Sequence, residues 1–237
     1  MKSWDDPRIR RGMEAQLKAL HARRAAGEKS IGWKVGFGAP AIMQQLGISA
    51  PLVGFLTDRA RVESGATVSL AGWKKPVFEP EIAVHMGADL PAGGDKEAAK
   101  HAIAGIGPAI ELADLERSPQ PDTLEAILAG NIFQRHVIVG PCDRSRTGAK
   151  VDGLTGRIFR RGAEVAKTTE LTANTGDPVG LVRHVADLLA AFGERLEAGQ
   201  FIITGSVVPP LFLEAADDRA SYELDPIGGL SLRFTYG

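Results

Sequence analysis

The sequence has little of what disulfide-bonded, exported or membrane-spanning proteins need. Its 237 residues include one cysteine, Cys142, so no internal disulfide can form, and this favours a reducing compartment. No run of about 20 apolar residues is present. The N-terminal stretch MKSWDDPRIRR also lacks the apolar segment of a secretory signal. We therefore expect a soluble protein of the cytoplasm.

The sequence also lacks an excess of charge of either sign. Its 28 Lys and Arg against 29 Asp and Glu give a net charge of -1, and the basic residues are scattered without interleaved aromatics. This pattern argues against binding to nucleic acid or to an anionic membrane. With no long linker, low-complexity tract or repeat, we expect one domain over residues 1–237, of which 1–29 form a short N-terminal helical segment.

Two stretches carry strong helix signals. Apolar residues recur at helical spacing over residues 8–26, and this amphipathic helix should end at Gly27. A second helix is predicted over 178–192, where Asp177 is placed to cap the N-terminus and Pro178 takes the first position. Shorter helices are expected in two further stretches, residues 41–47 and 95–104.

Strand signals are numerous and irregularly spaced. They cover three segments between residues 51 and 90, followed by AIELADL at 109–115, HVIVG at 136–140, FIITG at 201–205 and LSLRFTY at 230–236. A doubly wound parallel sheet would show steady alternation of strand and helix, which is absent here. The pattern predicts an α+β domain with a mixed, curled β-sheet and flanking helices.

Two glutamates stand in the otherwise apolar run KPVFEPEIAV at residues 75–84. On a strand, residues i and i+2 share a face, so Glu79 and Glu81 should project together with their Cα atoms about 7 Å apart. Pro80 between them suits an edge position or a bulge. A buried carboxylate needs a positive partner, and two that converge can share one cation.

A third acid, Glu111, lies in the apolar stretch GPAIELADL. Three carboxylates without a nearby cysteine or histidine ligand describe a site for a hard cation such as Mg²⁺ or Mn²⁺. His85 would lie some 13 Å from Glu81 along a regular strand, too far to share its ion. From spacing alone the simpler interpretation stays open, in which the pair is solvated or bonded to the neighbouring Lys74 and Lys75.

Several segments in order resemble the fumarylacetoacetate hydrolase superfamily, and within it the branch of 2-keto-4-pentenoate hydratases and 4-oxalocrotonate decarboxylases. The similarity covers about residues 30–237. It is carried by GWKVGFG (32–38), MQQLGISAPLVGFLTD (43–58), KPVFEPEIAVHMGADLP (75–91), PAIELADLE (108–116), GDPVGLVRHVADLL (176–189) and ITGSVVPPLFLEAADD (203–218).

The resemblance implies a β-roll-like mixed sheet and a divalent metal, Mg²⁺ or Mn²⁺, on the matching acids. These are Glu79, Glu81 and Glu111, and the metal would chelate the 2-oxo and carboxylate oxygens of a small 2-oxo acid.

The resemblance also implies roles for polar residues around the substrate. Lys34 and Asp58 match residues that lie beside the substrate and assist proton transfer, while Asn131 and Ser206 match substrate-binding positions. One departure concerns the loop at Asn131, where Gly130 stands in place of the aspartate that the family often has. We also expect the N-terminal helical region to be shorter than is usual in the branch.

The implied activity is that of a hydro-lyase in the catabolism of aromatic ring-cleavage products. It would add water to a 2-hydroxy-2,4-dienoate to give a 4-hydroxy-2-oxo acid, and a Lewis-acid metal would stabilise the negative charge on the C2 oxygen. The resemblance further implies a homo-oligomer, and a complex with a related decarboxylase is a possible assembly.

Three alternatives remain open at this stage. The first is decarboxylation of a vinylogous 2-oxo diacid of the 4-oxalocrotonate type. The second is C–C hydrolysis of an acylpyruvate, which would want a base such as a histidine near the start of the chain. His21 is the only histidine before Lys34, and its place on the predicted helix counts against this activity. The third is a non-catalytic subunit that binds oxo acids.

Overall fold

The computed structural model describes residues 2–237 and contains five α-helices and two β-sheets. The helices are α1 (Pro7–Ala25), α2 (Pro40–Leu46), α3 (Lys96–Ala102), α4 (Leu124–Ala129) and α5 (Pro178–Ala191). The first sheet has the order β2-β1-β9-β4-β5-β6, and β10 pairs with β4 outside this path. Its strands are β1 (Ser30–Gly36), β2 (Leu52–Thr57), β4 (Pro76–Met86), β5 (Ile103–Asp114), β6 (Gln134–Val139), β9 (Phe201–Ser206) and β10 (Leu211–Phe212).

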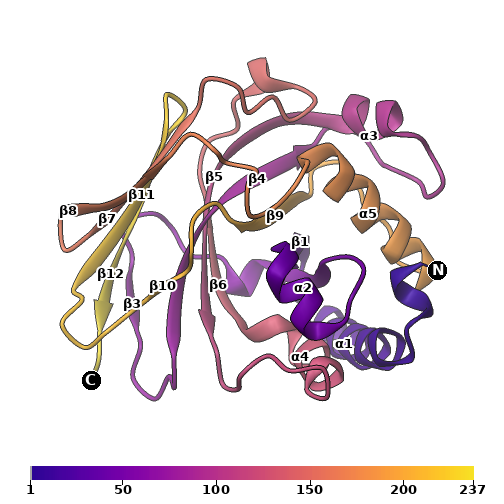
Figure 1. The fold of residues 1–237 in the computed structure, drawn as a ribbon, viewed down its shortest axis with the longest axis horizontal. Helices are drawn as coiled ribbons and strands as arrows, with labels where there is room; N and C mark the ends of the chain where they lie inside the picture. The colour runs from indigo at the N-terminus through magenta and orange to yellow at the C-terminus, as the bar shows by residue number, and fades with distance from the viewer. Residues whose placement is uncertain (1) are drawn as a thin grey trace.

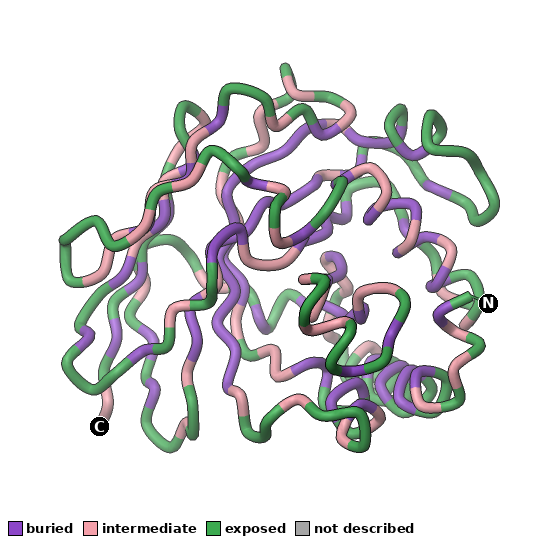
Figure 2. Tube along the Cα trace, in the orientation of Figure 1, coloured by how far each residue is buried: buried purple, intermediate pink, exposed green. Residues whose placement is uncertain are grey.

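The second sheet has the order β3-β12-β11-β7-β8 and lies to one side of the first, opposite α1, α2 and α4 (Figure 1). Its strands are β3 (Thr67–Ser69), β7 (Thr155–Arg160), β8 (Ala163–Thr168), β11 (Arg219–Asp225) and β12 (Gly228–Thr235). Burial is greatest where β4 and β5 run between the second sheet and the helices (Figure 2). These observations confirm the predicted α+β class and the mixed, curled sheet.

The first sheet curls until its two ends meet. Arg61, just beyond β2, forms a parallel bridge with Val137 of β6, and the Val62 N–H donates to the Val137 carbonyl at 3.0 Å. The inner face of this small barrel holds a separate hydrophobic cluster of Leu56, Ala83, Ala109, Val137, Phe201 and Ile203. Glu79, Glu81 and Glu111 share that inner face by strand alternation, so they lie at one end of the barrel interior.

The outer face of the barrel packs against helices and the second sheet in one large core. Helices α1 and α4 approach closely at Gly12, where a Cβ atom would stand 2.6 Å from Cβ of Leu128. Buried Gln16 fastens the same helices to the barrel, because its side-chain amide donates to the carbonyls of Val53 and Leu128. The N-terminal helix therefore supports β2 and the segment that follows α4.

The predicted helices and the predicted strands are all present, with shifts of a few residues at their ends. The sequence did not predict α4, the strands β1, β10 and β11, or the hairpin of β7 and β8. The hairpin turns at Arg161 and Gly162, which both have positive φ, as two-residue hairpin loops require. Strand β8 is largely exposed, and both strands carry charged residues, so neither shows the clear apolar alternation that reveals a strand.

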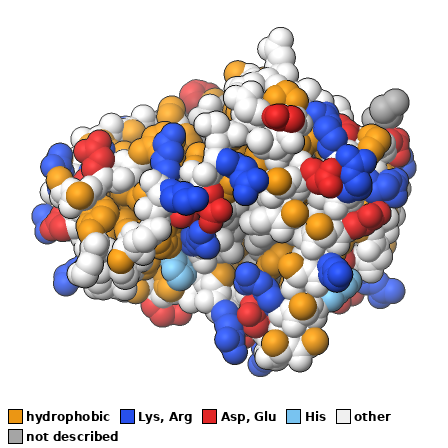
Figure 3. Space-filling model, turned by 90° about the horizontal axis from the view of Figure 1, so that it is seen from below, with side chains coloured by type: hydrophobic (Ala, Val, Ile, Leu, Met, Phe, Trp, Pro, Cys, Tyr) orange, Lys and Arg blue, Asp and Glu red, His pale blue; other side chains and the backbone are white. Residues whose placement is uncertain are grey.

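Charges of both signs are mixed over the surface. On the face shown in Figure 3, Lys and Arg side chains are interspersed with Asp and Glu, and hydrophobic side chains gather toward the second sheet. None of the helices formed by residues 2–237 combines the length and apolar character needed to cross a lipid bilayer.

Candidate metal centre and substrate cavity

Three glutamates converge at one end of the barrel. Glu79 on β4 stands directly opposite Glu111 on β5, and Glu81 stands opposite Ser206 on β9. Carboxylate oxygens from the three acids all lie within 4.8 Å of one another. The structure therefore confirms that Glu79 and Glu81 project together, and it brings Glu111 to the same point.

The acids lie in a largely buried site that contains little positive charge. Glu81 and Glu111 are 0% exposed, and the Lys34 side chain of β1 is 2% exposed. The Lys34 ammonium forms an ion pair with Oε1 of Glu111 and donates to the Ile132 carbonyl at 3.1 Å. The Gly205 N–H donates to Oε2 of Glu81 at 2.5 Å. One ammonium group thus faces three carboxyl groups.

Burial raises the pKa of each acid, and repulsion between the acids adds to the rise for Glu79 and Glu81. Loss of hydration raises the pKa of Glu79 to about 7, with the Glu111 charge adding to the effect. The pKa of Glu81 lies well above its usual value through burial and then the charges of Glu111 and Glu79. Burial also raises the pKa of Glu111, although Lys34 opposes this shift. Three ionised carboxylates at this point require a further cation.

The acids meet the requirements of a divalent metal site. Oε1 of Glu81 and Oε2 of Glu111 are buried and have no hydrogen-bond partner within residues 2–237. Buried carboxylate oxygens without partners are rare and costly, and a cation between them would supply the missing interaction. An all-oxygen donor set without cysteine or histidine suits a hard cation such as Mg²⁺ or Mn²⁺. The residues present therefore fit the metal that the sequence predicts.

A cavity of about 450 Å³ opens beside the acids. Lys34 and Glu79 are its charged lining residues, Ser206 also lines it, and a cavity of this size suits a small molecule. Ser206 Oγ is buried and has no partner among the described residues, so the predicted substrate-binding serine is free to bind a ligand. The structure thus brings Lys34, Ser206 and the three glutamates together.

The predicted substrate-binding residue Asn131 does not face the cavity. Its Oδ1 accepts from the Phe55 N–H at 2.8 Å, and its Nδ2 donates to the Phe55 carbonyl at 3.0 Å. Both ends of the amide are therefore committed to the β2 backbone. A direct contact of Asn131 with the substrate, as the resemblance implies, is not supported by this geometry.

Asn131 instead holds a strained turn that positions Lys34. Asn131, Ile132 and Phe133 all have φ between 53° and 63°, a left-handed run that costs energy in each residue. This turn presents the Ile132 carbonyl to Lys34. Gly54 of β2 lies beneath it, and a Cβ there would stand 2.8 Å from Oδ1 of Asn131 and 2.9 Å from Cγ of Lys34. Only glycine leaves room for both side chains.

The structure does not place Asp58, the second proton-transfer residue that the resemblance implies, at the cavity. Lys34 pairs with Gly54 across the β1–β2 ladder, and Asp58 is four residues further along, about 13 Å away on a strand. Asp58 is exposed, accepts from the Lys29 N–H at 3.0 Å and does not line the cavity. Its side chain links the start of β1 to the end of β2.

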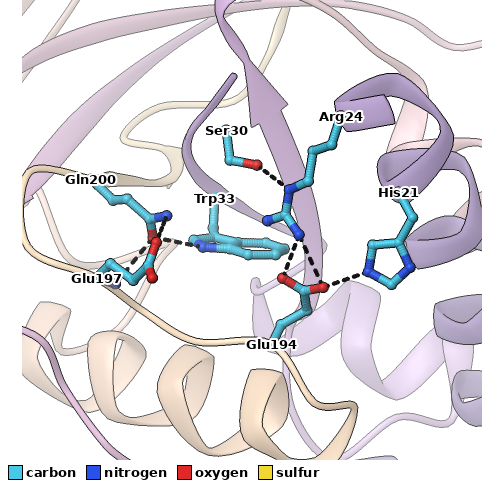
Figure 4. A network of polar contacts seen from close by, with 7 residues as sticks. All are labelled: His21, Arg24, Ser30, Trp33, Glu194, Glu197 and Gln200. Carbon is cyan, nitrogen blue, oxygen red and sulfur yellow. Dashed lines mark hydrogen bonds and ion pairs between the residues drawn. The ribbon is translucent and has the colours of Figure 1, made fainter. Parts of the chain in front are cut away.

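The histidines and Arg135 lie outside the cavity. His21 contacts Glu194 at 2.6 Å in a network that ties the end of α1 to β1 and to the loop before β9 (Figure 4). His136 stacks on Trp73, and Arg135 pairs with acids outside the cavity. His85 lies on the inner barrel face but not with the three glutamates, as the strand spacing predicts.

The sequence analysis missed several residues of the cavity wall. Asn174 and Thr175, in the loop before α5, line the cavity, and Thr175 lies close to Gly205. The turn-forming stretch TANTG at 172–176, immediately before the Asp177 cap, was the available signal, because ligand-binding residues are often found on such loops. Phe37, Phe133 and Phe212 also line the cavity, and their apolar character gave no sign of this.

Comparison with known proteins agrees with this geometry. Residues 33–235 match the family described as fumarylacetoacetate (FAA) hydrolase C-terminal. The chain is 30% identical to 2-hydroxyhexa-2,4-dienoate hydratase of Comamonas testosteroni over 222 residues, or 92% of this chain and 83% of that protein. It is 31% identical to 4-oxalocrotonate decarboxylase of Pseudomonas putida over 224 residues, with the same coverage of each.

A solved structure shows the same fold. It is 4-oxalocrotonate decarboxylase from Pseudomonas putida G7 complexed with magnesium and adipate, with a TM-score of 0.84 and 26% identity. The alignment covers 94% of this chain and 85% of that one. A second structure of that enzyme, complexed with calcium and acetate, has a TM-score of 0.83. The chain belongs to the fumarylacetoacetate hydrolase family and is an enzyme of that superfamily.

Proposed function

We propose that this enzyme is a divalent-metal-dependent hydro-lyase that adds water to a 2-hydroxy-2,4-dienoate to give a 4-hydroxy-2-oxo acid. The observation that carries the proposal is the buried group of Glu79, Glu81 and Glu111 beside Lys34 at the cavity. The hydratase of Comamonas testosteroni, 30% identical, supports the choice of reaction. So does the 2-keto-4-pentenoate hydratase of Burkholderia vietnamiensis, which is 26% identical over 90% of this chain.

The three glutamates would hold Mg²⁺ or Mn²⁺, with Oε1 of Glu81 and Oε2 of Glu111 as unpartnered donors. When bound, the metal supplies a Lewis acid for the carboxylate and C2 oxygens of the substrate. The magnesium and calcium in the solved structures of the 4-oxalocrotonate decarboxylase, 26% and 27% identical to this chain, support a divalent ion at this position.

Lys34 is the group placed to move protons. The reaction transfers the enol proton of the substrate to C5 and then adds hydroxide to C4 and a proton to C3. The Lys34 ammonium lines the cavity, and its ion pair with Glu111 and its hydrogen bond to Ile132 fix its direction. A fixed amine that can give up and regain a proton serves as general acid and base.

Ser206 is placed to orient the substrate or the attacking water. Its Oγ is buried, has no partner in the described part of the chain, and belongs to the strand position opposite Glu81. A hydroxyl can donate to a carboxylate and accept from water. The apolar remainder of the cavity wall limits the access of bulk water.

Decarboxylation of a vinylogous 2-oxo diacid is the second candidate. The 31% identity to the Pseudomonas putida decarboxylase favours it, and breaking the C–C bond also places electrons on the C2 oxygen. C–C hydrolysis of an acylpyruvate has less support, because His21 is bonded to Glu194 outside the cavity.

An absorbance assay distinguishes these reactions. The purified protein is incubated with 2-hydroxypenta-2,4-dienoate and with 4-oxalocrotonate, each with Mg²⁺, with Mn²⁺ or with EDTA. The proposal predicts metal-dependent loss of the dienol with formation of 4-hydroxy-2-oxopentanoate, and no turnover with EDTA. Release of CO₂ from 4-oxalocrotonate without hydration of the dienol would assign the enzyme to the decarboxylases instead.

A further inference from the structure

The walls of the cavity are mostly apolar, whereas one end of it is charged. Beyond Lys34, Glu79 and Ser206, its polar residues are Asn174, Thr175 and Thr204. The remaining lining residues are glycines or apolar residues, and the apolar ones include Val35, Ile42, Leu115, Ile132, Val208, Pro209, Pro210 and three phenylalanines. A ligand that binds its polar head at the glutamates would therefore extend its tail along an apolar wall.

We infer that the cavity selects 2-oxo acids with one carboxylate and an apolar tail over diacids of the same length, and that Phe37, Phe133 and Phe212 determine this selection. The inference rests on the proposed function, since it places the 2-oxo acid head at the metal centre.

The first support is the absence of a free cation to receive a second carboxylate. Among the lining residues in the described part of the chain, Lys34 is the one cation, and it is paired with Glu111. Arg135, which follows the strained turn, pairs with Asp114 at 3.5 Å and Glu116 at 2.6 Å. A distal carboxylate in the cavity would lose its hydration without gaining a partner, whereas a methyl group would gain from burial.

Lys75 is the cation to consider at the rim. Its ammonium lies 4.4 Å from the centroid of the Phe212 ring, and the residue itself is exposed and does not line the cavity. The Lys75 charge is thus exposed to solvent and lies over the Phe212 ring. A diacid could benefit from Lys75 only by extending out of the apolar part of the cavity, so a Lys75 variant tests this possibility.

The second support is the way in which the three phenylalanines are placed. Phe37 and Phe133 pack edge to face with centroids 6.4 Å apart, and both have left-handed backbone, with φ of 56° and 63°. Such conformations are unfavourable for aromatic residues, and they cluster at active sites and ligand-binding sites. Two of the three phenylalanines that line the cavity are therefore held in strained backbone conformations.

Phe212 forms the third part of this wall, from the short strand β10. It is 42% exposed, one of two large hydrophobic side chains that are exposed among residues 2–237. A tail that passes along the cavity would cover the ring and remove apolar surface from water. Binding would therefore strengthen as the tail gains methylene groups.

Calorimetry with saturated 2-oxo acids tests the inference apart from turnover, because these ligands cannot be hydrated. The Mg²⁺-loaded protein is titrated with pyruvate, 2-oxohexanoate and 2-oxoadipate, which share a head and differ in the tail. We expect 2-oxohexanoate to bind at least tenfold more tightly than either of the others. If 2-oxoadipate binds as tightly as 2-oxohexanoate, the inference fails while the proposed head site stands. If none of the three binds, the proposed function fails as well.

Two variants test whether the aromatic wall causes the preference for an apolar tail over a second carboxylate. In Phe212→Ala, the loss of affinity for 2-oxohexanoate should exceed the loss for pyruvate at least threefold. Lys75→Ala is the matched control at the rim, and it should leave the ratio of affinities for 2-oxohexanoate and 2-oxoadipate within twofold of the wild type. Equal losses for both ligands in Phe212→Ala, or a ratio that moves more in Lys75→Ala, would overturn the assignment.

Discussion

Replacement of Glu81 by glutamine should stabilise the metal-free protein and weaken its metal binding. The side chain is fully buried, its Oε2 accepts from the Gly205 N–H, and its Oε1 has no partner in residues 2–237. A glutamine carbonyl oxygen can keep the hydrogen bond from Gly205. The change therefore removes one negative charge with little change of shape.

The size of the two effects follows from the geometry of the three acids. Two like charges about 4.8 Å apart repel by about 3 kcal/mol at an effective dielectric constant of about 20. Protonation already relieves part of this repulsion, because the pKa of each acid is raised. We expect a gain of about 1–2 kcal/mol at pH 8, or a rise in Tm of about 2–8 °C for a chain of this size. Loss of one charged ligand should lower Mn²⁺ affinity at least about tenfold.

Thermal unfolding in EDTA and calorimetric titration with Mn²⁺ measure the two effects. Glu63→Gln is a matched control, since the Glu63 side chain is 87% exposed and is not one of the three clustered acids. It should change neither quantity. A Glu81→Gln protein that is folded, binds Mn²⁺ as the wild type does and has a lowered Tm would refute the reasoning.

Three further predictions concern the same site. Lys34→Ala should keep Mn²⁺ affinity within a few-fold but lower kcat at least about 100-fold, because the group that moves protons is lost; wild-type kcat would exclude this role. Asn131→Gly keeps the left-handed backbone but removes both hydrogen bonds to Phe55, so it should cost about 1–3 kcal/mol of stability and lower kcat with little change in Mn²⁺ affinity. Unfolding in urea and steady-state kinetics check both effects, and an unchanged kcat would show that the turn does not position Lys34. The free energy of unfolding of the metal-free protein should fall as the pH rises from about 4.5 to 7, because folded Glu79 keeps its proton to about pH 7 whereas unfolded Glu79 loses it near 4.5. The difference amounts to about 3 kcal/mol at the upper end, from about 1.4 kcal/mol for each pKa unit. Urea unfolding in EDTA at a series of pH values measures it, and stability that rises over this range would contradict the assignment.

The acidic end of the site could be predicted because it depends on local rules. Glu79 and Glu81 are two residues apart in a strand, so they share a face whatever the strand pairs with. The pairing of Glu79 with Glu111 is a matter of long-range register, which a single sequence does not determine. The apolar surroundings of Glu111 nevertheless marked it as a charge in need of a partner.

The roles of Asp58 and Asn131 could not be predicted because they depend on where the chain turns. Asp58 follows the strand that pairs with β1, and the antiparallel register carries it away from Lys34. Asn131 lies close to Lys34, but its amide fits the backbone of Phe55. Both outcomes depend on tertiary contacts, which the spacing of residues in the sequence does not reveal.

The residues of the cavity wall could not be predicted from the sequence either. Phe37, Phe133 and Phe212 come from three separate segments, and each looks like an ordinary core residue in the sequence. Only the fold shows that they surround a cavity, and only the backbone angles show that two of them are held under strain.

Anomalous diffraction tests the central claim most directly, namely that the three glutamates hold a divalent cation which receives a 2-oxo acid. Crystals grown with Mn²⁺ and pyruvate would be measured at the manganese edge. We predict one strong anomalous peak within bonding distance of Glu79, Glu81 and Glu111, with the carboxylate and 2-oxo oxygens of pyruvate completing the coordination. Ordered glutamates without a peak between them, at saturating Mn²⁺, would contradict the account.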